Sequence, residues 1–301
     1  MTNKDKYKNF CIDKVPVYSQ YWWLDALCGE ENWDVILIEK NNQIIASLPY
    51  EIQKKENGKI QLGQPILTQS LGPYIIYPKN MKYNNKLSYE KKIMNELIYN
   101  LPEHDKYAQN FYYTITNWLP FYWKGFSQTT RYTYIINDLS NLDNIWNEFS
   151  SNTKNEINKV KNKVNIVYDL DPQLFYDINS ITFNKQNVSM PYSFEVFDCL
   201  LKASQKNNCG KTFFAIDSQK NIHGVLFLVW DNFSSYYLMG GAGNTPYKQV
   251  SKYLIWKAIQ FSSKFVNKFD FEGSMKENIE VVFRKFGAVQ TPYFHIEREK
   301  L

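Results

Sequence analysis

Cysteine and histidine are scarce in this 301-residue chain, which contains 4 Cys and 3 His. The cysteines show no C-x-x-C spacing: Cys11, Cys28, Cys199 and Cys209. Zinc sites and disulfide frameworks need closer or more numerous cysteines, so we expect no metal, no disulfide framework and no Cys–His catalytic pair. We interpret the three histidines as structural residues: His104, His223 and His295.

Long apolar runs are also missing. No uninterrupted apolar stretch reaches the roughly 18 residues that a membrane-spanning helix needs. The N-terminal sequence MTNKDKYKNF is polar and lacks the hydrophobic region of a signal peptide. We therefore expect a soluble, cytoplasmic protein without a transmembrane segment.

Glycine and proline are too few for a fibrous protein, at 12 and 11 residues. Apolar residues make up 44% and charged residues 22%, which predicts a sizeable folded core. The net charge of +5 permits an anionic substrate, but no dense basic block indicates DNA binding. Aromatic residues are abundant at 17%, which suits both a core and a groove for an amphipathic ligand.

The hydrophobic pattern predicts strands and helices in mixed order. In the first half it predicts a helix over residues 19–28, then a hairpin of residues 33–40 and 43–52 that turns at Asn41-Asn42. The second half reads α, β, α, α, β, β, β, α, β, α, β, beginning with a helix from Asp143 to about Lys163. A parallel crossover joins the strands 235–241 and 268–273. The predicted class is α+β, with mixed, mainly antiparallel sheets flanked by helices.

The two halves end alike, which predicts an internal duplication. KGFSQTTRYTYI at residues 124–135 aligns without gaps on KFGAVQTPYFHI at residues 285–296, with four identities. Each segment follows a strand and a short helix and precedes a closing strand. We therefore predict two tightly packed domains, residues 1–140 and residues 141–301.

FDFEGSMKENIEVVFRKFG at residues 269–287 resembles the C-terminal signature of Fem-like acyltransferases, which consist of two GNAT-type domains. Three further segments resemble the uncharacterised acetyltransferase branch of this superfamily: residues 21–38, 71–78 and 236–263. The resemblance implies tandem GNAT-like domains and acyl transfer to an amine from a thioester or aminoacyl-tRNA donor. It also implies that the N-terminal domain recognises the acceptor and that the C-terminal domain binds the donor.

Two departures from the family pattern bear on the donor. In GNAT enzymes, spaced glycines at the start of the helix after the fourth strand hold the CoA diphosphate. The corresponding strand here is the one at residues 235–241, and the helix after it opens with YKQVSKYL at residues 247–254, which has no such glycines. The tRNA-dependent members carry Lys after a Phe of the C-terminal helix, where this chain has Phe283-Arg284-Lys285. Either basic residue could substitute for that lysine.

Glu272, at the end of a predicted strand, is the first candidate for the general base or for a group that binds the acceptor amine. Asp270 alternates with it on the same strand face and is its candidate partner. Tyr237 could protonate the leaving group. Packing or capping roles are the structural alternatives for all three.

Candidate donor-binding residues lie around the glycine-rich turn after the fourth strand, on the next helix and on the C-terminal helix: Gly240, Gly241, Gly243, Asn244, Lys248, Lys252, Ser274, Arg284 and Lys285. Candidate acceptor-binding aromatics lie in the first half, where they could equally be core residues: Trp22, Trp23, Tyr74 and Tyr77.

The sequence therefore favours an N-acyltransferase that uses acyl-CoA or another acyl thioester as co-substrate. The expected acceptor is a small molecule with an amine, such as a nucleotide-linked amino sugar of cell-envelope biosynthesis. One alternative is an aminoacyl-tRNA-dependent Fem-type enzyme acting on a peptidoglycan-like precursor, with tRNA as a partner. Another is a non-catalytic protein that binds a glycan intermediate.

Overall fold

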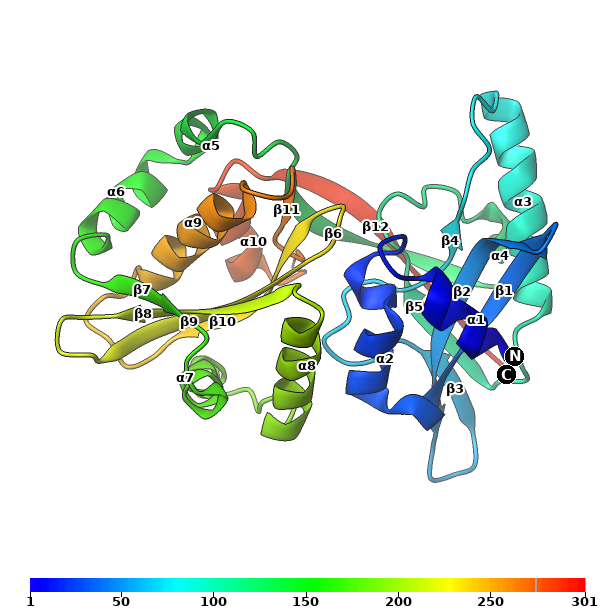
Figure 1. Cartoon of the computed structure of the whole chain (residues 1–301), viewed down its shortest axis with the longest axis horizontal. Helices are drawn as coiled ribbons and strands as arrows, with labels where there is room; N and C mark the ends of the chain where they lie inside the picture. Colours follow the sequence, from blue (N-terminus) through cyan, green and yellow to red (C-terminus); the bar gives the residue numbers. More distant parts are fainter. Residues whose placement is uncertain (274, 301) are drawn as a thin grey trace. The chain divides into compact units, whose positions relative to one another are not determined.

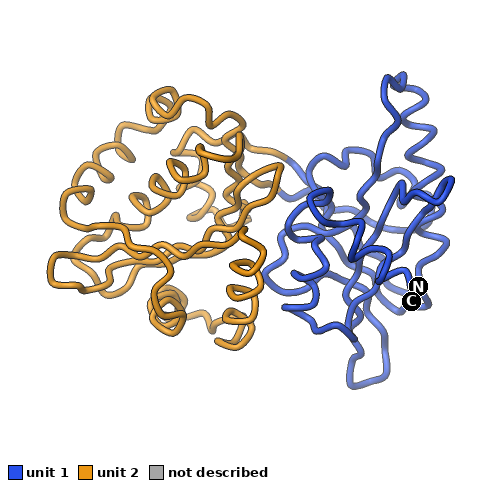
Figure 2. The backbone as a smooth tube through the Cα atoms, viewed as in Figure 1, with its two compact units in different colours: residues 1–131, 292–301 blue, residues 132–291 orange. Residues whose placement is uncertain are grey.

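The computed structural model describes residues 1–273 and 275–300 and divides into two compact units (Figure 2). Unit 1 consists of residues 1–131 and 292–301, and unit 2 of residues 132–291. This division differs from the predicted boundary at 140/141 in two respects. The first crossing falls inside a strand rather than in the following loop, and the C-terminal segment returns to unit 1.

The sheet of unit 1 follows the order β1, β2, β3, β5, β12, and the short β4 also pairs with β2 (Figure 1). The strands are β1 (Trp33–Lys40), β2 (Gln43–Lys54), β3 (Ile60–Gly63), β4 (Tyr74–Ile75), β5 (Lys106–Asn110) and β12 (Val289–Glu299). The predicted β1–β2 hairpin is confirmed. Asn41 and Asn42 both have positive φ, 51° and 60°, as a tight hairpin turn requires.

Side chains of β1 alternate between two cores. Ile36 and Ile38 pack with α3 (Tyr83–Tyr99) and α4 (Leu119–Tyr122). Trp33 and Val35 pack on the other face with α1 (Asn3–Phe10) and α2 (Tyr21–Cys28). Helix α2 is shorter than predicted, because residues 17–19 form a 3-10 turn, η1 (Val17–Ser19), before it. A second such turn, η2 (Glu30–Asn32), leads into β1.

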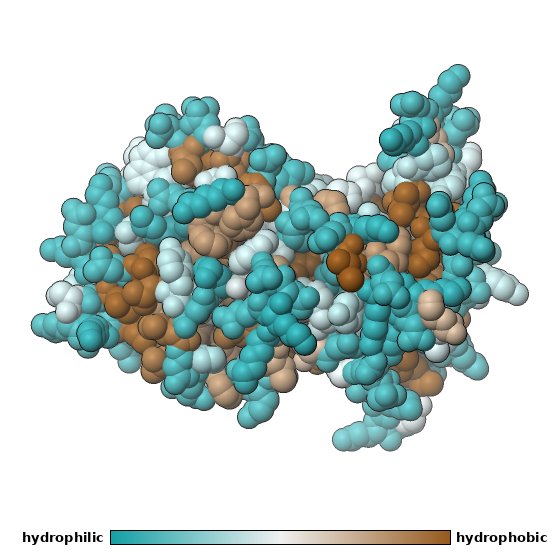
Figure 3. Space-filling model, in the orientation of Figure 1, coloured by the Kyte–Doolittle hydropathy of each residue, from teal (hydrophilic) through white to brown (hydrophobic). Residues whose placement is uncertain are grey.

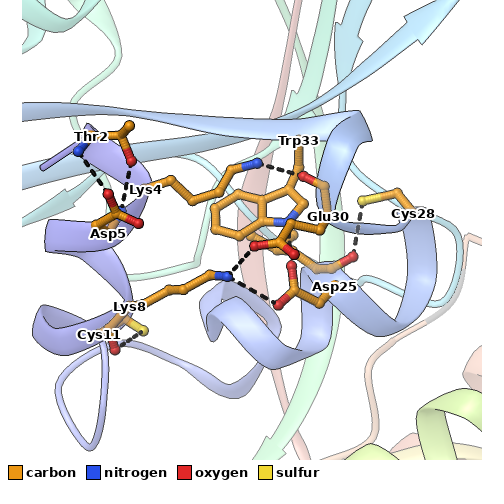
Figure 4. A network of polar contacts seen from close by, with 10 residues as sticks. Thr2, Lys4, Asp5, Lys8, Cys11, Asp25, Cys28, Glu30 and Trp33 are labelled. Atoms are coloured by element: carbon orange, nitrogen blue, oxygen red, sulfur yellow. Dashed lines mark hydrogen bonds and ion pairs between the residues drawn. The ribbon is translucent and has the colours of Figure 1, made fainter.

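Charged contacts tie α1 to α2 and β1 (Figure 4). Lys8 Nζ lies 2.5 Å from Glu30 Oε1 and 3.7 Å from Asp25 Oδ2. Asp25 also accepts a 2.8 Å hydrogen bond from the indole N–H of Trp33. Lys4 Nζ sits 4.6 Å above the Trp33 ring, a cation–π geometry. The network holds the N-terminal helix against the Trp33 side of the sheet.

The sheet of unit 2 follows the order β6, β11, β10, β9, β8, β7. The strands are β6 (Ser127–Ile136), β7 (Asn165–Tyr168), β8 (Gly210–Ile216), β9 (Ile222–Trp230), β10 (Ser235–Ala242) and β11 (Phe269–Asp270). Only β10 and β11 pair in parallel here, joined by the helix α9 (Val250–Ser262). This confirms the predicted α-helical crossover and the mainly antiparallel α+β class.

Helices cover both faces of this sheet (Figure 1). On one face lie α5 (Leu142–Glu148), α6 (Ser151–Val160), α9 and α10 (Glu277–Arg284); on the other lie α7 (Pro172–Asn184) and α8 (Phe194–Lys206). Adjacent strand residues serve the two sides. Phe213 packs with the α9 side, whereas Phe214 packs against Phe175 of α7, with ring centroids 6.0 Å apart.

The helix predicted from Asp143 to about Lys163 is in fact two helices. Phe149 ends α5 in an extended conformation (ψ 140°), and its side chain is buried. Ser150 then caps α6, because its hydroxyl accepts a hydrogen bond from Thr153 N. Ser followed by a fresh amphipathic turn was a start signal that the continuous apolar spacing concealed.

The two repeated segments form β6 and β12, and each crosses the division between the units. β6 begins in unit 1, and its end pairs with β11 in unit 2. β12 begins in unit 2, and its end pairs with β5 in unit 1. Each closing strand thus completes the sheet of the other unit.

On the face shown in Figure 3, hydrophilic side chains predominate and apolar ones gather in separate patches. Among the residues the structure describes, no helix combines the length and apolar character required to cross a membrane.

Two glycines of unit 1 offer a matched test of its packing. Gly58 and Gly72 have nearly equal φ, 79° and 78°, so alanine is strained at both. A Cβ at residue 58 would meet nothing within 4 Å, whereas one at residue 72 would lie 2.5 Å from a ring carbon of the buried Phe111. We expect Gly58→Ala to cost about 1 kcal/mol of unfolding free energy and Gly72→Ala about 2–4 kcal/mol.

Thermal and urea unfolding of the two variants would measure this difference. Equal destabilisation would contradict the close contact between residue 72 and Phe111.

Candidate functional site

The parallel strands β10 and β11 part after a very short pairing. Only Ser235 with Phe269 and Tyr236 with Asp270 are in register. Beyond Tyr236, β10 continues to Ala242, whereas β11 ends. Within the described residues, this edge of β10 therefore has backbone groups without a partner on β11.

After Asp270 the chain stays hydrogen-bonded to β6 and no longer pairs with β10. Phe271 N donates a 2.9 Å hydrogen bond to Tyr134 O, which extends the antiparallel contact with β6 past the end of β11. Glu272 and Gly273 then both adopt left-handed backbone conformations, with φ 60° and 63°. A Cβ on Gly273 would lie 2.0 Å from Tyr132 O, so only glycine fits against β6 here.

The open edge of β10 contains a bulge between Tyr237 and Met239. The hydroxyl of Tyr237 lies near Gly240, 2.8 Å from where a Cβ would be. It makes no hydrogen bond to any residue that the structure describes. Burial raises the pKa of this phenol to about 12, so it stays protonated at neutral pH.

The two candidate carboxylic acids are joined through the backbone. Asp270 is buried, and its Oδ1 accepts hydrogen bonds from Thr133 Oγ1 and, at 2.8 Å, from Glu272 N. Burial raises the pKa of Asp270 to about 6 and raises that of Glu272 well above its ordinary value. The expected alternation on one strand face does not occur, because Glu272 lies past the strand in a turn.

Phe283 of α10 links the two sides of the opening. Its ring centroid lies 6.1 Å from that of Tyr237 and 5.0 Å from that of Phe271. Tyr237 and the segment that leads to Glu272 therefore share a neighbour. The structure gathers all three predicted catalytic residues at the point where β10 and β11 separate.

A buried polar chain that was not predicted from the sequence supports the bulge from the α7 side. Asn179 Nδ2 donates to the Tyr192 hydroxyl at 2.6 Å, and that hydroxyl contacts Met239 Sδ at 3.2 Å. Asn179 Oδ1 is buried without a donor among the described residues. The signal was an asparagine on the apolar face of a predicted helix, four residues after Phe175.

Close packing of α7 surrounds two of the glycines predicted to bind the donor. A Cβ on Gly241 would lie 2.2 Å from Thr182 Oγ1, and one on Gly243 would lie 3.2 Å from Ile178 Cδ1. Lys185 Nζ also donates to Gly243 O at 2.7 Å. The close approach of α7 to β10 therefore explains why Gly241 and Gly243 are small. Gly240 is also closely packed, because a Cβ there would lie 2.7 Å from Val225 O of β9.

The turn before α9 is held by a buried histidine. His223 contacts Asp217 Oδ2 at 3.0 Å through Nε2 and Thr245 Oγ1 at 2.8 Å through Nδ1. Thr245 Oγ1 accepts from Tyr247 N at 3.0 Å. This agrees with a structural role for His223.

The basic donor-binding candidates differ in their partners. Asn244 and Lys248 are exposed, whereas Lys252 pairs with Glu156 of α6. Arg284 pairs with Glu280 one turn earlier at 3.2 Å. The Lys285 side chain is half-buried at the end of α10. Ser274 lies outside the described residues.

The acceptor-binding candidates belong to unit 1. Trp23 is fully buried, and its indole N–H donates to Thr68 Oγ1 at 3.0 Å, whereas Trp22 is half-buried. Tyr74 packs on Phe10 with centroids 6.3 Å apart. Tyr77 donates to Glu90 Oε1 at 2.9 Å. Trp23 thus has the contacts of a core residue, and acceptor binding by the others stays a prediction.

Over residues 1–273 and 275–300, no cluster of three or more His, Cys, Asp or Glu side chains could hold a metal ion. At the opening the structure provides backbone groups, a phenol and two acids, which can form hydrogen bonds and exchange protons with a ligand.

Comparison with solved structures identifies proteins that share this fold. No model of a known protein family matches the sequence, and no curated protein does so. Among solved structures, FemX matches with a TM-score of 0.71 at 10% identity, over 98% of this chain and 96% of that one. L-PGS from Bacillus licheniformis matches with a TM-score of 0.59 at 10% identity, over 99% and 92% of the two chains.

A tandem GNAT protein from the clavulanic acid biosynthesis pathway matches with a TM-score of 0.51 at 8% identity, over 95% of this chain and 97% of that one. The chain therefore has the fold of Fem-like and tandem GNAT proteins, and the predicted fold resemblance is confirmed.

The raised pKa of Asp270 makes stability depend on pH. The folded state binds this proton more tightly than the unfolded state, so stability falls as the pH rises from about 4 to about 6 and stays lower above that. Asp270→Asn keeps the Oδ1 acceptor but cannot ionise. We expect the melting temperature of the wild type, relative to this variant, to fall over that interval.

Melting curves of both proteins across this pH range measure the effect. Glu272 is present in both, so its titration cancels in first approximation. Parallel curves would contradict the burial of an ionisable carboxyl at residue 270.

Proposed function

We propose that this protein is an N-acyltransferase that binds its donor in unit 2, where β10 and β11 separate. The observation that carries the proposal is the open edge of β10 next to the Tyr237 hydroxyl and Glu272. An acyl donor needs backbone hydrogen bonds to align it, and an unpaired strand edge supplies them without special side chains. The fold shared with FemX and with a tandem GNAT protein supports the same chemistry by analogy.

In the proposed reaction, an amine nitrogen attacks the thioester carbonyl carbon. The C–N bond forms and the C–S bond breaks through a tetrahedral intermediate, whose oxyanion is stabilised by amides of β10. Glu272 accepts the proton that the amine loses, and burial, which raises the pKa of this carboxyl, makes its ionised form a stronger base. The Tyr237 phenol gives its proton to the leaving thiolate.

Asp270 acts through Glu272 in this proposal. Its carboxyl holds the backbone N–H of Glu272 at 2.8 Å, and so it helps keep the turn in its left-handed conformation. The Thr133 hydroxyl donates a hydrogen bond to the Asp270 carboxyl and so fixes its orientation. Asp270 and Thr133 are therefore positioning residues.

For the substrates, we propose an acyl-CoA or another acyl thioester as donor. The proposed acceptor is an amine on a cell-envelope precursor, such as a nucleotide-linked amino sugar. The residues around the α9 start, including Lys248, are the proposed phosphate contacts.

An aminoacyl-tRNA donor is the second candidate. Two observations motivate this alternative: Lys252 pairs with Glu156, and α7 packs over Gly241 and Gly243. Both reduce the groups available for a CoA diphosphate at the start of α9. The high structural similarity to FemX is consistent with this alternative.

We expect Tyr237→Phe and Glu272→Gln each to lower kcat by about a hundredfold in proteins that remain folded, as cooperative melting would show. Thiol release from acetyl-CoA and longer acyl-CoAs, in the presence of an amino-sugar nucleotide, measures the rate. Tyr168→Phe on β7 is the matched control, because this tyrosine is exposed and outside the opening.

Amide formation from aminoacyl-tRNA, without any thiol release from acyl-CoA, would select the second donor. Binding of an amino-sugar nucleotide without turnover of either donor would support the non-catalytic alternative and refute the proposal.

A further inference from the structure

Unit 1 exposes three large apolar side chains on a single helical turn. Leu119, Tyr122 and Trp123 are 48%, 58% and 54% exposed. Their spacing of i, i+3 and i+4 puts them on one side of α4. Phe121, between them in sequence, is fully buried in the core of unit 1. The turn is thus anchored by one aromatic residue and presents three apolar residues to the surroundings.

Lysines adjoin this turn. Lys91 of α3 lies with Nζ 4.9 Å from the centroid of the Trp123 ring, and Lys124 directly follows and is exposed. Residues 79–92 contain five lysines and one acid, Glu90. That acid is buried and accepts hydrogen bonds from Tyr77 and Asn117, so its carboxylate is turned inward. We call the surface formed by Leu119, Tyr122, Trp123, Lys91 and Lys124 the basic–aromatic face.

From this juxtaposition we infer that the basic–aromatic face binds the surface of an anionic phospholipid bilayer. Trp and Tyr partition to the headgroup level of a bilayer, and leucine adds apolar area below it. Lysine can extend its ammonium to lipid phosphates while its stem stays beside the ring, as Lys91 does on Trp123.

The cations favour a lipid surface over a protein partner. Protein interfaces are enriched in arginine and depleted in lysine, whereas anionic lipid surfaces attract clusters of lysine as well as of arginine. All the cations in residues 79–92, and the one at residue 124, are lysines. Attachment would be peripheral, through side chains of α3 and α4. The inference does not depend on the proposed acyl transfer.

Sedimentation with vesicles tests the inference. We expect the full chain to bind vesicles of phosphatidylcholine mixed with phosphatidylglycerol at low salt, and to bind much less to pure phosphatidylcholine. Tyr122→Ser/Trp123→Ser should lower the binding constant at least tenfold. Lys91→Gln and Lys124→Gln should each lower it about fivefold and weaken its dependence on salt.

Phe265→Ser and Lys220→Gln are the matched controls, because both residues are exposed and belong to unit 2. We expect both to bind vesicles as the wild type does. No binding to either vesicle, equal binding to both, or unchanged binding by the Tyr122/Trp123 variant would overturn the inference. Self-association that this variant abolishes, without vesicle binding, would assign the face to a second copy of the chain.

Discussion

The candidate site depends on how β11 pairs with its two neighbours, β10 and β6. β11 pairs in parallel with β10 for only two residue pairs, and then β6 keeps the chain through the hydrogen bond from Phe271 N to Tyr134 O. The left-handed turn at Glu272 and Gly273 follows, with Gly273 pressed against Tyr132 O. Because this segment stays paired with β6, β10 has no β11 neighbour beyond Tyr236. The bulge, the Tyr237 hydroxyl and the two acids lie around this opening.

Packing within each unit accounts for three residues that the sequence suggested for ligand binding. Gly241 and Gly243 lie beneath side chains of α7, and Trp23 fills the core of unit 1. Tyr237 is different, since its half-buried side chain makes no hydrogen bond to another described residue at the point where β10 and β11 separate. A hydroxyl that lies at an opening and makes no bond within the protein is available to a ligand or to water, and the proposed chemistry is therefore centred there.

The closing strands β6 and β12 each run from one unit into the other. They contain most of the two similar sequence segments, and each completes the sheet of the unit that it enters. A donor site in unit 2 and a lipid-binding face in unit 1 would give the two units different roles. The buried Glu90 pairs with Lys86 at 3.5 Å and accepts hydrogen bonds from Tyr77 and Asn117, so residues 79–92 add no exposed carboxylate beside Lys91 and the aromatic turn of α4.

The α+β class, the β1–β2 hairpin and most of the element order of the second half are predictable from the sequence, because periodicity and turn residues such as Asn41-Asn42 act locally. Glu272, Asp270 and Tyr237 are also named as candidates from the sequence. Three features required the three-dimensional structure: Ser150 divides a predicted helix into two, β6 and β12 run from one unit into the other, and Asp270 contacts the backbone of Glu272 instead of sharing a strand face with it. These features depend on contacts between residues far apart in the chain, such as Thr133 with Asp270, and local pattern carries no information about such contacts.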